Sequence, residues 1–175
     1  MPFKTIFLDR DGVINKEIGY LHKIEDFIFI DGVIETCRIL NTLGYQIIII
    51  TNQSGIGRGY YSTKDFNQLT HWMLKKFLDN DVIIKDVFFC PHSPDDLCKC
   101  RKPLPGMIKE AIEKHDVDIA NSWSIGDKED DISAAKDSNI ANTVLVRSGH
   151  SIEETKTEAD YVIDSLKDLI NILKN

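Results

Sequence analysis

Two carboxylates spaced two positions apart stand near the start of the chain, directly after a short apolar run. Residues Thr5–Leu8 favour a strand, and Asp9, Asp11 and Gly12 follow them. Positions i and i+2 of a strand share a face, and glycine lets the backbone turn sharply after it. Two carboxylates this close repel each other unless a cation or a shared proton relieves them. The pattern fits a metal-assisted acid–base pair, or simply the solvated acidic end of a strand.

Two later apolar runs also end in polar residues. Thr51 and Asn52 follow one run, and Asp127 follows another. The carboxyl ends of parallel strands meet at one edge of a sheet, where ligands bind. Asp9, Asp11 and Asp127 would together form an oxygen-rich site suited to Mg²⁺, which also binds phosphate oxygens. Three polar strand ends at one edge are difficult to attribute to solubility alone.

Basic residues and backbone amides complete the chemistry expected for phosphoryl transfer. Lys102 offers a point charge and Arg101 a planar fork, while Thr51 and neighbouring amides can donate to phosphoryl oxygens. A cation, a lysine and such donors around a nucleophilic carboxylate make a phosphoryl-transfer site. The chain has no P-loop sequence, and residues 54–59 lack the dinucleotide-binding glycine spacing. We interpret that glycine-rich segment as a flexible loop that holds Arg58 near the substrate.

A second group of chemically reactive residues lies within eleven consecutive positions. Cys90, His92, Cys98 and Cys100 supply three thiolates and one imidazole, a complete tetrahedral zinc set. The alternative is a reduced loop with incidental cysteines. A closed set of four ligands leaves no position for water, so we expect a structural zinc that fixes the loop carrying Arg101 and Lys102.

Composition limits the classes of protein to which the chain can belong. The 175 residues are 42% hydrophobic, enough for one globular domain spanning 1–175. The net charge of −7 argues against nucleic-acid binding, so an anionic substrate needs a local basic cluster. There is no apolar run of about 18 residues, and Met1–Lys4 leads directly into the first strand. We expect a cytoplasmic monomer that acts on a small molecule and binds no membrane.

Strand-like and helix-like segments alternate, which predicts an α/β fold with a doubly wound, mostly parallel sheet. An irregular insert follows Asp11, and Asp127 is expected to cap the fourth helix. The predicted strands are 5–8, 45–50, 85–90, 122–125, 143–146 and 161–163, and the predicted helices are 31–43, 63–78, 105–114, 128–136 and 166–173.

These motifs resemble those of the haloacid-dehalogenase (HAD) superfamily of phosphatases, in order and over nearly the whole chain. The resemblance rests on Asp9-Arg10-Asp11-Gly12, Thr51-Asn52-Gln53, Arg101-Lys102-Pro103 and Gly126-Asp127 with Asp131. It implies that Asp9 is a nucleophile forming an aspartyl-phosphate and that Asp11 is the general acid and then base. Thr51 and Lys102 would stabilise the phosphoryl group. Asp9, the Asp11 carbonyl and Asp127 would hold Mg²⁺, with Asp131 nearby.

The cysteine-rich loop narrows the resemblance to the branch containing heptose-bisphosphate and histidinol-phosphate phosphatases. Gly19-Tyr20-Leu21-His22 and Thr51–Gly59 are similar to the heptose enzymes, which serve lipopolysaccharide precursor synthesis. The short zinc-loop spacing is closer to the histidinol-phosphate group, and Glu17-Ile18 departs from the usual heptose pattern. No large insertion provides a cap domain, so short loops must control access. The expected substrate contacts are Glu17, Gly19, Tyr20, Asn52, Gln53, Ser54, Arg58, Arg101 and Lys128.

Two other classes of protein remain to be weighed against a phosphatase. A receiver-type signalling domain also gathers aspartates around Mg²⁺, but it would store the phosphoryl group and needs neither a second acid nor a zinc loop. A zinc-supported binding module would not need the set Asp9, Asp11, Thr51, Lys102 and Asp127. The sequence therefore favours an enzyme that removes a phosphate from a bisphosphorylated heptose, with histidinol phosphate as the alternative substrate.

Overall fold

The computed structural model describes residues 1–174 and contains one six-stranded sheet in which every pair of neighbouring strands is parallel. The order is β3-β2-β1-β4-β5-β6, so the chain runs outward from β1 in one direction and then, from β4, in the other. The strands are β1 (Thr5–Leu8), β2 (Gln46–Asn52), β3 (Ile84–Cys90), β4 (Trp123–Gly126), β5 (Asn142–Val146) and β6 (Tyr161–Ile163). The predicted doubly wound fold is confirmed.

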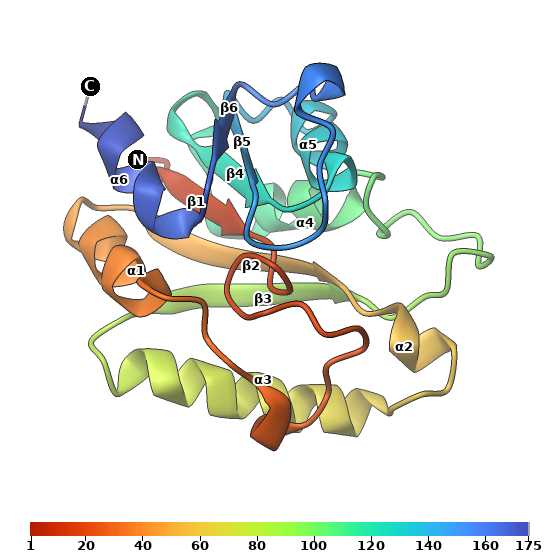
Figure 1. Ribbon diagram of the computed structural model, residues 1–175. Helices are drawn as coiled ribbons and strands as arrows, with labels where there is room; N and C mark the ends of the chain where they lie inside the picture. Colours follow the sequence, from red (N-terminus) through yellow and green to blue (C-terminus); the bar gives the residue numbers. More distant parts are fainter. Residues whose placement is uncertain (175) are drawn as a thin grey trace.

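Helices cover both faces of this sheet, as Figure 1 shows. They are α1 (Val33–Thr42), α2 (Ser54–Gly57), α3 (Thr63–Leu78), α4 (Gly106–His115), α5 (Glu129–Lys136) and α6 (Leu169–Leu173), with 3₁₀ turns at Ile24–Asp26, Ile119–Asn121, Glu154–Lys156 and Leu166–Asp168. Among residues 1–174 no helix combines the length and apolar character required to cross a membrane.

Alternation along the strands divides the core into two layers. On β1, Ile6 and Leu8 pack with α1, α3 and α6, whereas Phe7 packs with α4 and α5. The central strand β2 is buried on both faces, which is why its sequence is a continuous apolar run. A sheet covered on both faces leaves its strand ends as the places where polar groups can gather.

The structure differs from the sequence prediction at two places near the expected site. Ser54–Gly57 forms the short helix α2, not a flexible loop, because Gly57 N–H donates to the Pro91 carbonyl and ties the turn to the cysteine-rich loop. Asp127 does not cap α5, whose N-cap is Lys128. The carboxylate of Asp131 instead accepts from the backbone N–H groups of Asp127 and Lys128, which leaves Asp127 free to face the strand ends.

Candidate active site

The predicted catalytic residues converge beyond the carboxyl ends of β1, β2 and β4, where the sheet reverses its strand order. Asp9 follows β1, Asn52 ends β2 and Asp127 follows β4, and all three line one cavity of about 330 Å³. Thr51 lies directly behind it and is fully buried. A crevice at such a topological switch point is the usual ligand site of an open α/β sheet.

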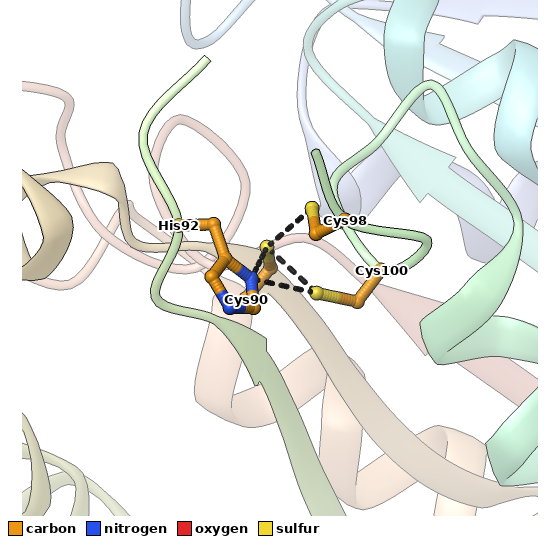
Figure 2. A group of neighbouring side chains, drawn as sticks. All are labelled: Cys90, His92, Cys98 and Cys100. Carbon is orange, nitrogen blue, oxygen red and sulfur yellow. Dashed lines mark hydrogen bonds between the residues drawn. The ribbon is translucent and has the colours of Figure 1, made fainter. Parts of the chain in front are cut away.

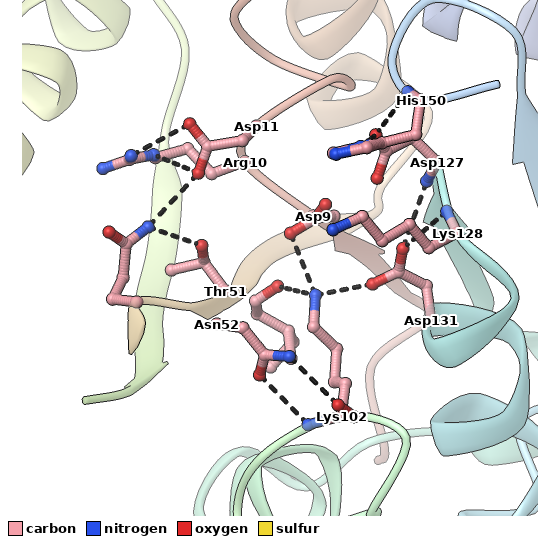
Figure 3. Close-up of polar contacts among 12 residues, drawn as sticks. Asp9, Arg10, Asp11, Thr51, Asn52, Lys102, Asp127, Lys128, Asp131 and His150 are labelled. Carbon is pink, nitrogen blue, oxygen red and sulfur yellow. Dashed lines mark hydrogen bonds and ion pairs between the residues drawn. The ribbon is translucent and has the colours of Figure 1, made fainter. Parts of the chain in front are cut away.

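A buried lysine holds two of the carboxylates together (Figure 3). Lys102 Nζ lies 2.9 Å from Asp9 Oδ1 and 2.6 Å from Asp131 Oδ1, and it donates to the Ile50 carbonyl at 2.8 Å. Burial alone would lower the pKa of Lys102, but the carboxylates of Asp131 and Asp9 raise it above its ordinary value. The ammonium therefore stays charged and occupies a fixed position beside Asp9.

The surroundings of Asp9, in contrast, disfavour its charged form. Its burial raises its pKa well above 3.8, and the carboxylates of Asp131, Asp127 and Asp11 add to this, while Lys102 opposes it. One ammonium thus does not balance the surrounding negative charge. A further cation at this point would favour the ionised Asp9 that a nucleophile requires.

Asp127 supplies a second observation that favours a cation. Its Oδ1 atom is buried and has no hydrogen-bond partner among residues 1–174, while Oδ2 accepts from His150 N–H at 2.9 Å and lies 2.6 Å from His150 Nδ1. Gly12 and Gly149 pack so closely that a Cβ on either would lie 2.3 Å or 2.1 Å from Oδ2. The close backbone thus restricts the Asp127 side chain to one orientation, in which Oδ1 has no hydrogen-bond partner among residues 1–174.

Ligand atoms of Asp9, Asp127 and Asp131 lie within 4.8 Å of one another, so the donor set fits a hard divalent ion. Both oxygens of Asp131 are already engaged, one by Lys102 and one by two backbone N–H groups. Asp9 and Asp127 therefore each keep a carboxylate oxygen that can bind a metal ion, whereas Asp131 binds the Lys102 ammonium.

The side chain of Asp11 is held by its own set of donors. Arg10, which is 1% exposed, donates from Nε to Oδ2 at 3.2 Å and from a terminal nitrogen to Oδ1 at 3.0 Å. Asn15 donates to Oδ1 at 3.0 Å, and Gln53 donates to Oδ2 at 3.2 Å. Four hydrogen bonds thus fix the carboxylate in one plane. No role was predicted for Arg10, because its contact with both oxygens of Asp11 becomes visible only in three dimensions.

Asn52 and Gln53 were both expected to contact substrate, and both line the cavity. The Asn52 amide, however, donates to the Lys102 carbonyl and accepts from the Lys102 N–H, both at 3.0 Å. Gln53 donates to Thr51 Oγ1 at 2.9 Å as well as to Asp11, and accepts from the Tyr61 hydroxyl. The Asn52 amide thus attaches Lys102 to the end of β2, and the Gln53 amide joins Thr51 to Asp11.

The cysteine-rich loop brings its four predicted ligands together (Figure 2). Cys90 Sγ lies 2.9 Å from Cys100 Sγ, 3.8 Å from Cys98 Sγ and 3.4 Å from His92 Nδ1, and the four ligand atoms all lie within 4.8 Å of one another. Three thiols so close, beside an imidazole nitrogen, fit a tetrahedral zinc ion. Burial and the neighbouring Cys100 raise the pKa of the Cys90 thiol.

The rim of the cavity contains the other predicted substrate residues. Glu17, Gly19, Tyr20, Ser54, Arg58, Arg101 and Lys128 all line it. Tyr20, at a left-handed φ of 51°, packs edge-on against Tyr60 with ring centroids 4.7 Å apart. The rim thus combines basic side chains with an exposed aromatic pair.

Five residues that line the cavity were not among the expected site residues: Arg10, Leu21, Tyr61, Asp130 and His150. Of the two histidines in nearby loops, His150 lines the cavity, whereas His22 stacks on the Tyr61 ring, with centroids 4.9 Å apart, and is not part of the lining. The Gly149-His150 pair after β5, a further strand end, is the signal that could have identified His150.

Comparisons with known proteins agree with this geometry. Residues 99–169 match the family model described as HAD-hydrolase-like. A solved structure of D,D-heptose 1,7-bisphosphate phosphatase from B. bronchiseptica, complexed with magnesium and phosphate, superposes with a TM-score of 0.86 and 29% identity, covering 98% of each chain. The fold and the four motifs define a HAD-type hydrolase.

Curated relatives narrow this class. The D-glycero-β-D-manno-heptose-1,7-bisphosphate 7-phosphatases of Yersinia pestis and Escherichia coli (strain K12) are 45% and 44% identical, covering 97% of this chain and 95% and 93% of theirs. The corresponding α-anomer enzyme of Photorhabdus laumondii is 48% identical over 89% of each chain. The chain belongs to the family of D-glycero-D-manno-heptose-1,7-bisphosphate 7-phosphatases.

Proposed function

We propose that this protein removes the 7-phosphate of D-glycero-D-manno-heptose 1,7-bisphosphate in the synthesis of nucleotide-heptose precursors. The observation that carries the proposal is the pairing of buried Asp9 with Lys102 beside the bare Oδ1 of Asp127. The length over which the heptose phosphatases match this chain supports that substrate over histidinol phosphate.

Asp9 is the nucleophile of the proposed reaction. Its carboxylate attacks phosphorus, an Asp9–phosphorus bond forms, and the bond from phosphorus to the sugar oxygen breaks. Lys102 Nζ, 2.9 Å from Asp9 Oδ1, neutralises charge that develops on the phosphoryl oxygens. The Thr51 hydroxyl, which already accepts from Gln53, has its own proton available for the phosphoryl group.

In the proposed reaction, Asp11 is the general acid and then the general base. In the first step it donates a proton to the departing sugar oxygen, and in the second it takes one from the water that hydrolyses the aspartyl-phosphate. General acid–base help of this kind contributes about 10²–10⁴-fold. Asp9 and Asp11 thus divide nucleophilic and proton-transfer work between them.

The metal ion of the proposal is Mg²⁺, held by Asp9, Asp127 and the backbone carbonyl of Asp11, with Asp131 nearby. When bound, it supplies positive charge that binds phosphate oxygens and keeps Asp9 ionised. The bare oxygen of Asp127 and the acidic surroundings of Asp9 support this assignment. The magnesium and phosphate of the B. bronchiseptica structure support it independently.

A second metal, Zn²⁺, is proposed for Cys90, His92, Cys98 and Cys100 in a structural role. The chain passes from Cys100 directly into Arg101 and Lys102, and Gly106 N–H donates to the Lys99 carbonyl at 3.1 Å. A closed metal centre in the loop would lower the entropy lost when the two basic residues are positioned. A monomeric, cytoplasmic enzyme completes the proposal.

The rim of the cavity accounts for the choice of phosphate. Without a large cap, a phosphate on a primary carbon at the end of a substrate can reach Asp9 most directly. The other phosphate would remain at the rim, where Arg58, Arg101 and Lys128 carry positive charge. Arg101 has a buried terminal nitrogen with no hydrogen-bond partner within residues 1–174, which leaves it free for an anion.

The test is phosphate release from the heptose bisphosphate and from histidinol phosphate, side by side with added Mg²⁺. We expect turnover of the bisphosphate with loss of the 7-phosphate, and little turnover of histidinol phosphate. Asp9→Asn should abolish the reaction, because an amide is no nucleophile, while circular dichroism remains that of the wild type. A variant that keeps most of its activity, or a preference for histidinol phosphate, would overturn the proposal.

A further inference from the structure

Gln53 is a buried residue whose amide has no proton left to donate to a substrate. It is 2% exposed. Its Nε2 atom donates to Asp11 Oδ2 at 3.2 Å and to Thr51 Oγ1 at 2.9 Å, which uses both protons of the amide. Its Oε1 atom accepts from the Tyr61 hydroxyl. The three partners are the proposed acid, a proposed phosphoryl ligand and an aromatic residue of the cavity wall.

We propose that Gln53 is a positioning residue, which orients the Asp11 carboxylate for proton transfer to the leaving oxygen, and that Tyr61 fixes Gln53 in turn. The sequence suggested that Gln53 contacts substrate directly, so this assigns it a different role. The inference rests on the proposed phosphatase reaction. In that reaction the proton leaves Asp11 for the sugar oxygen as the oxygen–phosphorus bond breaks.

The Asp11 carboxylate and the Tyr61 hydroxyl together favour one orientation of the Gln53 amide. A flipped amide would place its carbonyl oxygen against the Asp11 carboxylate, where two acceptors repel. Burial raises the pKa of Tyr61 to about 12, so its hydroxyl remains protonated and donates to Oε1 in the orientation that Asp11 requires. Only this orientation directs Nε2 at Asp11 and Thr51 together.

Close packing keeps Tyr61 itself in place. A Cβ on Gly55 would lie 2.2 Å from the Tyr61 ring, so only glycine fits beneath it. On its other side the ring stacks on His22, with centroids 4.9 Å apart and planes within 8°. His22 Nδ1 lies 2.9 Å from the Tyr20 carbonyl. A continuous series of contacts therefore runs from the rim loop, through Tyr61 and Gln53, to the acid.

Substrates with different leaving groups distinguish positioning of the acid Asp11 from direct contact of Gln53 with the substrate. An alkyl phosphate releases a poor leaving group that requires the proton, whereas 4-nitrophenyl phosphate releases a stable phenolate without it. Gln53→Leu keeps the side-chain size but removes every hydrogen bond. We expect kcat/KM for a sugar phosphate to fall about 10- to 100-fold, since misplacement by about 1 Å costs this much. The aryl phosphate should lose only a few-fold, through Thr51, which serves both substrates.

Two further variants sharpen the measurement. Tyr61→Phe removes only the hydroxyl and should reproduce the same leaving-group dependence, more weakly. Tyr161→Phe removes a hydroxyl on the remote edge strand β6 and should leave both rates unchanged. If Gln53→Leu fails to fold, Gln53→Glu can replace it, because a carboxylate still accepts from Tyr61 but cannot donate to Asp11.

A double-mutant cycle with Asp11→Asn decides between positioning and substrate contact. If Gln53 acts through Asp11, adding Gln53→Leu to Asp11→Asn should cause only the few-fold loss on the sugar phosphate that acts through Thr51. An unchanged fold-loss in that background, or equal losses on alkyl and aryl phosphates, would overturn the inference. Any alkyl phosphate that the wild type hydrolyses serves for the test, so a wrong heptose assignment would leave it intact. A wild type inactive on all phosphates would instead refute the proposed function.

Discussion

At the scale of single residues, Asn52 connects two distant parts of the chain. Its amide forms two hydrogen bonds of 3.0 Å with the backbone of Lys102, 50 positions away. No local pattern encodes that contact, so it could not be predicted. The types and spacing of Asp9, Asp11 and Lys102 did predict that they converge, and the structure brings them to one cavity. The catalytic roles of Asp9, Asp11 and Lys102 stay predictions until they are measured.

Lys102 provides the first test at this scale. Replacing it by Met leaves the buried carboxylates of Asp9 and Asp131 without their ammonium partner. Breaking a buried pair by removing one partner costs about 3–5 kcal/mol, so we expect a fall of that order in the free energy of unfolding, with loss of turnover. Urea denaturation followed by tryptophan fluorescence measures the change.

Lys114→Met is the matched control. Lys114 is 58% exposed and pairs with Asp86 at 2.8 Å on the surface, where such pairs contribute about 0–1 kcal/mol. If the two variants were destabilised equally, the buried carboxylates would not depend on Lys102 for their charge balance.

At the scale of elements, a helix was predicted correctly where local sequence determines its ends, and incorrectly where contacts with distant residues determine them. Helix α3 was predicted with its observed bounds because Ser62 and Asp65 form a reciprocal cap at its start. The short helix α2 was missed, since the contact of Gly57 with Pro91 that fixes it comes from another part of the chain. Asp127 was wrongly assigned as a cap, because Lys128 is the N-cap of α5 and the Asp131 carboxylate accepts from the N–H groups of Asp127 and Lys128 just before the helix.

The cap of α3 can be tested by Ser62→Ala. The Ser62 hydroxyl accepts from Asp65 N–H at 3.1 Å, and loss of such a cap typically costs about 1 kcal/mol. Ser151→Ala, which removes an exposed hydroxyl with no hydrogen bond within residues 1–174, should have little effect. Thermal unfolding of both variants measures the difference, and equal melting temperatures would show that α3 does not need its cap.

The stability lost in Ser62→Ala should depend on pH. Hydrogen bonds from the backbone and side chain of Ser62 lower the pKa of Asp65 below its ordinary 3.8. A depressed folded-state pKa contributes stability above the unfolded value and loses it as the pH falls through the folded value. The difference between wild type and Ser62→Ala should therefore be full at neutral pH and shrink in strong acid.

The proposed zinc site in the cysteine-rich loop can be tested by replacing one of its ligands. Cys98→Ser should lower bound zinc below one ion per chain and reduce thermal stability. It should also raise KM for the phosphate ester more than it lowers kcat, because Arg101 and Lys102 lose their fixed support. Cys37→Ala, at a buried position of α1, should leave the zinc content unchanged. Metal analysis decides, and a wild type purified without zinc would refute the assignment.

At the scale of the whole molecule, an acidic protein must bind an acidic substrate. The net charge is −7, so long-range attraction of a sugar bisphosphate is unfavourable. Binding therefore depends on the local group of basic residues at one end of the sheet, the end at which Lys102 is buried and Arg58, Arg101 and Lys128 line the rim. The alternation of strands and helices sufficed to predict that end of the sheet, because parallel topology places all strand termini together. The height and closure of the rim could not be predicted, since they follow from loop packing such as that of Tyr20 on Tyr60.

If one phosphate binds at Asp9 and the other at the rim, the enzyme should differ in kcat/KM between substrates with one and with two phosphates. The heptose 1,7-bisphosphate should have a much higher kcat/KM than a heptose 7-monophosphate, because only the bisphosphate has a second phosphate for the rim. Arg101→Ala should narrow this gap by raising KM mainly for the bisphosphate, since loss of a charged hydrogen bond costs about 1.5–3 kcal/mol. Arg38→Ala, on the surface of α1 and paired with Glu35, is the matched control and should change neither substrate. Phosphate-release kinetics on the two sugars measure the gap. Equal kcat/KM values in the wild type, or removal of the 1-phosphate first, would mean that the substrate enters in the opposite orientation.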